Sequence, residues 1–174
     1  MKTQNDAGVP FRAKRKMNAS GVTIVELIIV ATLAILLSTY ILGHFDPVRQ
    51  NAKARDNKRL SDSEYLDRAL NEYMLNNGAY PGAAGQLRLS TQLPLGNSGP
   101  LDSPQQGWID ADMSANTTRL PLDPRNDDSY FYSYMHSSTG YELNIRLEAL
   151  LDYSADDGGD DPDVYEIGND LSII

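Results

Sequence analysis

The chain has 174 residues, a formal net charge of −9 at pH 7 and no cysteine. Without cysteine it can form neither disulfides nor thiolate metal sites. Its acidic balance argues against binding to phosphate backbones, so we expect no direct nucleic acid binding. The length fits one domain plus a membrane segment. No G-x-S-x-G, Gly-rich phosphate loop or H-E-x-x-H motif occurs, and we therefore expect a protein that is not an enzyme.

The first 43 residues combine a basic leader with a long apolar run. The leader, residues 1–21, has five basic side chains and one acidic one, and the run from Val22 to Gly43 has a single charge, Glu26. A run of this length and composition is sufficient to cross a bilayer as a helix. A secretory signal would have a shorter apolar core with its small-residue cleavage site after that core, whereas Ser20 and Gly21 precede this one.

Glu26 is the feature that a plain signal-anchor helix does not explain. A carboxylate at membrane depth is costly and normally has a cationic partner. Cleavage before Val22 would create such a partner, because the new α-amine would be a cation beside the membrane. Basic residues flank both ends of the apolar run, so the distribution of positive charge does not decide the orientation of the helix.

A second helix is predicted over residues 48–77. Its apolar residues recur at the spacing of one helical face. These residues are Leu66, Ala69, Leu70, Tyr73 and Met74. Gly78 can take the left-handed conformation that ends a helix, and Pro81 follows it. Gly43 and Pro47 predict a bend or local break between the two helical segments.

The remaining chain predicts an irregular loop followed by a small sheet. Residues 82–120 are rich in Gly, Pro, Ser, Asn and Gln, which is typical of a long loop with at most one short element. Residues 130–135 and 141–148 have strand patterns separated by a turn at 137–140, and a third short strand is predicted at 164–167. The apolar positions of the second strand are expected to face the helix. These positions are Tyr141, Leu143, Ile145 and Leu147. The predicted fold class is α+β, with a small antiparallel sheet packed on the outer half of a long helix.

An acidic segment, residues 152–163, is a candidate cation site. Carboxylates on a flexible loop suit a hard, oxygen-liganded ion such as Ca²⁺. The candidate ligands are Asp156, Asp157, Asp160, Asp161 and Asp163. Their spacing does not match an EF-hand loop, and the alternative interpretation is a solvated acidic turn.

Three segments together carry a family resemblance that covers most of the chain. Residues 21–27, GVTIVEL, resemble the processing site of type IV pilins and type II secretion pseudopilins. Residues 55–81 resemble the second half of a pilin helix and its exit, and residues 120–134 resemble the segment that leads into the pseudopilin sheet. The chain differs from the family in having Val22 where Phe or Met is usual.

The resemblance implies a class III signal peptide and assembly into a filament. A prepilin peptidase would cut after Gly21 and methylate the amine of Val22, and Glu26 would pair with the amine of a neighbouring subunit. The implied organisation is a cleaved leader at 1–21, a transmembrane and assembly helix at 22–47, and a pilin-like globular domain at 48–174, with its variable loop at 82–120 and its sheet and acidic loop at 121–174.

The resemblance also implies a location and partners. The leader would lie in the cytoplasm and the globular domain outside the cytoplasmic membrane, later in a periplasmic or extracellular filament with other pilin or pseudopilin subunits. Major pseudopilins hold calcium in an acidic C-terminal loop, and residues 152–163 look similar in place and composition. The alternative is a membrane-anchored extracytoplasmic module that binds an ion or solute and does not polymerise.

Overall fold

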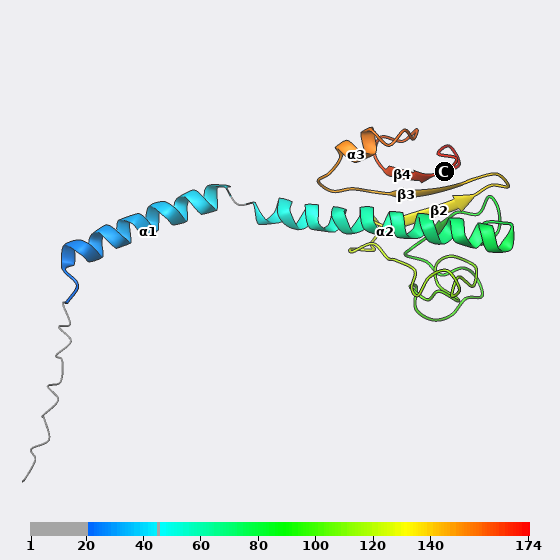
Figure 1. Ribbon diagram of the computed structural model, residues 1–174, viewed down its shortest axis with the longest axis horizontal. Coiled ribbons are helices and arrows are strands. Elements are labelled where there is room, and N and C mark those ends of the chain that lie inside the picture. The colour runs from blue at the N-terminus through cyan, green and yellow to red at the C-terminus, as the bar shows by residue number, and fades with distance from the viewer. Residues whose placement is uncertain (1–20, 45) are drawn as a thin grey trace, which may run out of the picture. The chain divides into compact units, whose positions relative to one another are not determined.

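The computed structural model describes residues 21–44 and 46–174. The predicted basic leader, residues 1–20, therefore lies outside the described residues, as does Phe45. The chain divides into two compact units, 1–45 and 46–174, and each is described by itself. The order of elements along the chain is α1, α2, β1, β2, β3, α3 and β4 (Figure 1).

The described part of the first unit contains α1, Ile24–His44. Its residues 24–41 have a mean hydropathy of 2.4, and none of this stretch is buried. Thr23 caps the helix, because its hydroxyl oxygen accepts a hydrogen bond from the backbone N–H of Glu26 at 3.2 Å. By length and composition the helix could cross a membrane, as the apolar run predicts.

The second unit begins with α2, Pro47–Asn77. The carboxylate of Asp46 accepts hydrogen bonds from the N–H groups of Val48 and Arg49, each at 3.1 Å, and Pro47 occupies the first turn, where no N–H is needed. Gly78 ends the helix at φ 76°, and its N–H donates to the carbonyl of Met74 at 2.8 Å. Pro47 thus starts a new helix, which explains why the helical pattern is interrupted there.

The sheet has four antiparallel strands in the order β1-β2-β3-β4. Their bounds are β1 Arg88–Leu89, β2 Tyr132–His136, β3 Tyr141–Ile145 and β4 Tyr165–Gly168. The predicted hairpin is present, and β2 starts later than expected because Asp127 caps a turn by accepting the N–H groups of Ser129 and Tyr130. β3 ends before Glu148, whose N–H bonds to Asp56 of α2 instead.

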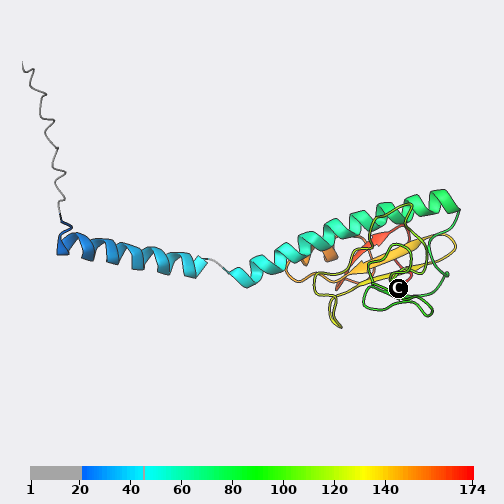
Figure 2. The ribbon, with the colours of Figure 1, turned by 90° about the horizontal axis from the view of Figure 1, so that it is seen from below.

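The core lies between α2 and the sheet, with α2 along one sheet face (Figure 2). The predicted face of α2 is confirmed: Leu66, Ala69 and Leu70 are buried and the other two residues pack partly against the core. The predicted inward residues of the second strand segment, 141–147, are all buried. The α+β fold class is therefore confirmed.

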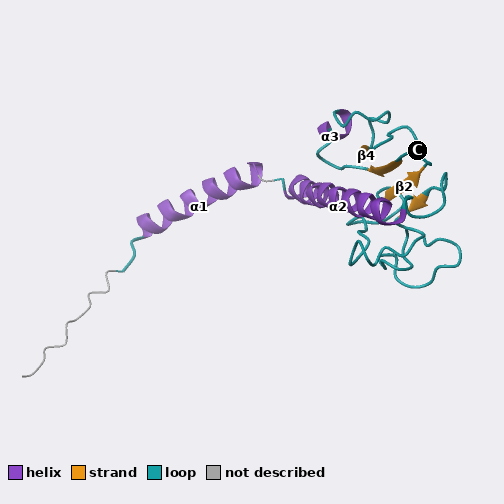
Figure 3. Cartoon of the chain, turned by 45° about the vertical axis from the view of Figure 1, so that its right-hand side comes forward, coloured by secondary structure: helices purple, strands orange, loops and turns teal. Residues whose placement is uncertain are grey.

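The irregular segment between α2 and β2 forms part of the core as well as connecting the two elements. Apart from β1 it is drawn as loop in Figure 3. It supplies four fully buried core side chains, Trp108, Ile109, Met113 and Leu120. The indole N–H of Trp108 donates to the carbonyl of Pro121 at 3.1 Å. A loop of this length is ordered because its own apolar side chains complete the core of the second unit.

Candidate assembly helix and acidic pocket

The described surface of α1 is mainly apolar. Its large apolar side chains are more than half exposed from end to end, for example Ile24 at 80% and Leu37 at 61%. Three of its hydroxyls are satisfied within the helix: those of Thr32, Ser38 and Thr39 donate to carbonyls four residues earlier, at 2.7–2.8 Å. The helix therefore offers mainly apolar side chains, and the hydroxyls of Thr32, Ser38 and Thr39 are paired within it, as lipid or other helices require.

Three predicted site residues lie at the start of α1: Gly21, Val22 and Glu26. Gly21 and Val22 are exposed and precede the helix, and a Cβ added at Gly21 would meet no atom within 4 Å. Glu26 is exposed in the first turn, three residues after the cap Thr23. This is the spacing of a capping box, and the positive end of the helix dipole favours a carboxylate there. The sequence interpretation missed this capping position, although Thr23-x-x-Glu26 is its signature.

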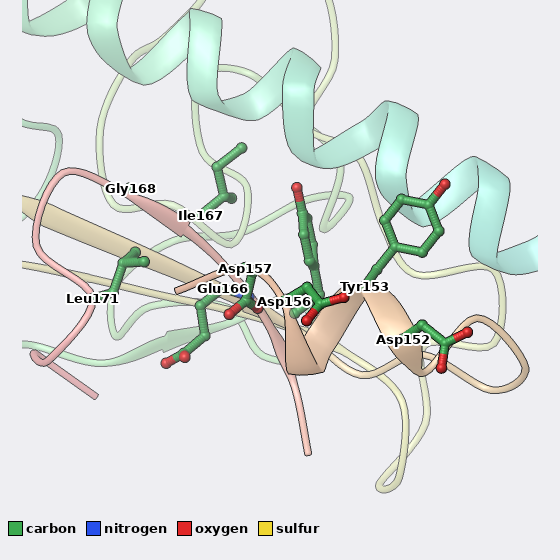
Figure 4. A pocket seen from close by; sticks show the side chains of 9 residues that line it. Asp152, Tyr153, Asp156, Asp157, Glu166, Ile167, Gly168 and Leu171 are labelled. Atoms are coloured by element: carbon green, nitrogen blue, oxygen red, sulfur yellow. The ribbon is translucent and has the colours of Figure 1, made fainter. Parts of the chain in front are cut away.

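A pocket of about 500 Å³ opens between the acidic segment and β4 (Figure 4). It lies beside α3, Asp152–Ala155, and β4. Its lining residues are Asp152, Tyr153, Asp156, Asp157, Tyr165, Glu166, Ile167, Gly168 and Leu171. Four of these residues carry carboxylates, so the pocket is acidic.

The five aspartates predicted as calcium ligands do not all reach this pocket. Asp156 and Asp157 line it, whereas Asp160, Asp161 and Asp163 do not. The carboxylate of Asp157 accepts the N–H groups of Gly159 and Glu166, at 2.9 and 2.7 Å, and that of Asp161 accepts the N–H of Asp163 at 2.9 Å.

Two of the predicted ligands, Asp157 and Asp161, thus accept hydrogen bonds from backbone N–H groups. Within residues 21–44 and 46–174, no group of three or more His, Cys, Asp or Glu side chains is placed to hold a metal ion. The described geometry therefore does not form a calcium cage, no step is derived through calcium, and calcium binding by the acidic segment stays a prediction.

A buried ionic cluster joins α2 to two distant segments. Arg59 is fully buried, and its guanidinium donates to Asp56, Asp123 and Glu148 at 2.6–2.9 Å. The hydrogen bond from Arg55, with further bonds and charge from Arg59, lowers the pKa of Glu148 to about 2. The cluster was not predicted, because its members are far apart in sequence, for example 89 residues between Arg59 and Glu148.

Comparison with known proteins gives one relative that matches most of the chain. The chain is 25% identical over 155 residues to type II secretion system core protein G of Pseudomonas aeruginosa. The match covers 89% of this chain and 97% of that protein. No family model matches the chain, and no solved structure gives a significant match. The relative, together with α1, confirms the resemblance of this chain to the type IV pilins and type II secretion pseudopilins.

Proposed function

We propose that this chain is a structural subunit of a pseudopilus or pilus filament, anchored in the cytoplasmic membrane before assembly. The observation that carries the proposal is α1, whose apolar side chains are exposed along its whole length. Such a surface needs cover, and a membrane or the matching helices of other subunits can supply it. The similarity to a type II secretion core protein supports the same role.

Processing at Gly21 would prepare the subunit for assembly. A prepilin peptidase would cleave the bond between Gly21 and Val22 and methylate the new amine. This bond lies outside the helix and its residues are exposed, so the backbone is accessible to a protease. The leader would remain in the cytoplasm and the acidic second unit would lie outside the membrane, in the periplasm or beyond.

Glu26 would act as the assembly contact. In a filament its carboxylate would face the Val22 amine of a neighbouring subunit, within an apolar bundle of α1 helices. At low dielectric this ion pair is directional and can set the axial register of the subunits. Head-to-tail contacts of this kind do not close, and therefore build a filament.

Replacing Glu26 by Gln tests this proposal. Glu26→Gln keeps the side-chain shape and removes the charge, so membrane insertion and folding should persist while incorporation into sheared filaments falls. Breaking one partner of a poorly solvated ion pair costs about 3–5 kcal/mol. Glu72→Gln, on an exposed position of α2, is the matched control and should assemble normally. Normal assembly of the Glu26→Gln variant would contradict the role of Glu26.

The second candidate function is a membrane-anchored module that binds an ion or solute and does not polymerise. The acidic pocket lined by Asp152, Asp156, Asp157 and Glu166 supports it. The two functions differ in the oligomeric state within the membrane. Because the wild-type chain has no cysteine, a variant with two introduced cysteines, one near each end of α1, can be treated with an oxidant in the membrane. A ladder of disulfide-linked copies would favour the filament subunit over the module.

A further inference from the structure

A groove of about 480 Å³ lies at the end of the second unit where the chain enters it. The first turns of α2 contribute Val48 and Arg49 to it, and the segment after β3 contributes Glu148 and Leu151. Tyr130 joins them from the segment before β2. All lining residues belong to the second unit, so the groove is formed without any residue of α1.

Two apolar side chains of this groove are uncovered. Val48 is 75% exposed and Leu151 is 57% exposed. Because both line one groove, they form a single apolar patch and are not scattered surface residues. Tyr130, half-buried in the same groove, adds an amphipathic aromatic ring of the kind that collects at membrane surfaces.

The carboxylates of the groove are already engaged within the unit. Asp46 accepts two backbone N–H groups at the start of α2. Glu148 accepts hydrogen bonds from Arg55 at 2.8 Å and from Arg59 at 2.6 Å. Arg49, by contrast, takes part in no ion pair among the residues that the structure describes. The groove therefore presents an unpaired cation beside its apolar patch.

The groove begins a short distance along the chain from the apolar stretch of α1. Val48 follows Ile41, the last residue of that stretch, by seven positions. Seven residues span at most about 25 Å, so a membrane that encloses α1 brings its surface within reach of the groove. Lys53, one turn after Arg49 and also without an ion pair in the described chain, adds a second positive charge. Asp152, the next residue after the groove in sequence, lines the acidic pocket instead.

A lipid surface supplies both the apolar cover and the anionic groups that these residues lack. We propose that the groove docks on the outer lipid surface of the cytoplasmic membrane, with Val48 and Leu151 entering the headgroup region and Arg49 bonding lipid phosphate. Buried apolar area and attraction to anionic lipid together determine the strength of such binding. The docking requires α1 to lie in the membrane, and it therefore rests on the proposed function. The second unit would be held on the lipid before assembly and would leave it when the subunit enters the filament.

A fluorophore on the full chain tests the docking in vesicles of phosphatidylcholine and phosphatidylglycerol. The chain has no cysteine, so Leu151→Cys can carry one environment-sensitive fluorophore. Lipids with a spin label on the headgroup should quench it, and its emission should shift to shorter wavelength. Leu75→Cys is the matched control, because Leu75 is 84% exposed and lies 27 residues after Val48 on α2, about 40 Å along the helix. Its fluorophore should not be quenched.

Replacing Arg49 by Gln separates docking from simple tethering by α1. One basic residue beside an anionic lipid surface strengthens binding about fivefold. Arg49→Gln should therefore lower the ratio of docked to undocked chains, reported by the Leu151 fluorophore, about fivefold. Arg68→Gln, at an exposed position further along α2, should leave this ratio unchanged. Vesicles of phosphatidylcholine alone should also lower it.

Equal quenching at Leu151 and Leu75, or unchanged quenching in Arg49→Gln, would overturn the proposal. A shift in emission at Leu151 that appears only at a high ratio of protein to lipid would also overturn it, because a second copy of the chain would then cover the groove.

A fluorophore at Leu33→Cys, in the exposed apolar stretch of α1, reports separately on the membrane anchor. Lipids with a spin label on the acyl chain should quench it. Absence of that quenching would contradict the proposed function, whereas quenching at Leu33 without quenching at Leu151 would contradict the docking alone.

Discussion

Arg59 is predicted to be the most sensitive charged residue of the second unit. Its Nε and Nη2 donate to the two oxygens of Asp123 at 2.6 and 2.9 Å, and its Nη1 donates to Asp56 and Glu148 at 2.8 and 2.6 Å. Asp56 in turn accepts the backbone N–H groups of residues 148–150. Arg59 therefore links α2, the segment before β2 and the segment after β3.

Replacing Arg59 by Met tests the contribution of this cluster. Met fills much of the same space, but it leaves three carboxylates that are at most 10% exposed without their shared cation. Removing one partner from a buried ion pair costs about 3–5 kcal/mol. Because a domain is typically stable by only about 5–15 kcal/mol, the variant should lose a large share of its free energy of unfolding.

Urea denaturation of residues 46–174, which contain the complete core cluster, measures this loss. Arg125→Met is the matched control, because Arg125 pairs with Asp127 at 2.9 Å with both side chains 41% exposed. An exposed pair contributes about 0–1 kcal/mol, so the control should change little. If Arg59→Met were as stable as Arg125→Met, the reasoning on the buried cluster would be refuted.

Two further predictions concern the carboxylates of the same unit. The pKa of Glu148 is lowered to about 2, so this group contributes stability that is complete above its ordinary pKa of about 4.3 and is lost as the pH falls toward 2. The urea midpoint should therefore decline less between pH 5 and pH 2 in Glu148→Gln than in the wild type. Equal declines in the two proteins would contradict this assignment. The second prediction concerns Ca²⁺ binding by Asp156, Asp157, Asp160, Asp161 and Asp163. If they bind it, free Ca²⁺ at 100 times Kd should add about 2.7 kcal/mol to the free energy of unfolding and raise the melting temperature more than Mg²⁺ or Na⁺ of matched ionic strength. Equal rises from the three salts would identify a solvated acidic turn.

Local patterns predicted the elements that follow a regular period. The apolar face of α2 and the inward residues of β3 could be read from helical and strand spacing, because burial on one side imposes that spacing. The end of α2 at Gly78 and the β2–β3 turn could be read from residues that favour those backbone conformations. The short strand β1 shows no such period, and the sequence predicted only that one short element could lie in the irregular segment.

The missed features depend on contacts between distant segments. Trp108 belongs to an irregular loop, and no period shows that such a residue enters the core. Arg59 and Asp123 are 64 residues apart, so their pairing leaves no local signal. The alternation of β3 identifies two faces but does not reveal that the C-terminal segment covers the second one, which is why the burial of Glu142 was unexpected.

The mass of the mature chain after co-expression with a prepilin peptidase tests the filament-subunit proposal most directly. The account predicts the loss of residues 1–21 and one added methyl group on the amine of Val22, with both changes abolished by Gly21→Leu. Cleavage of a second prepilin in the same cells shows that the peptidase is active. A chain that still begins at Met1 under those conditions would contradict the proposal.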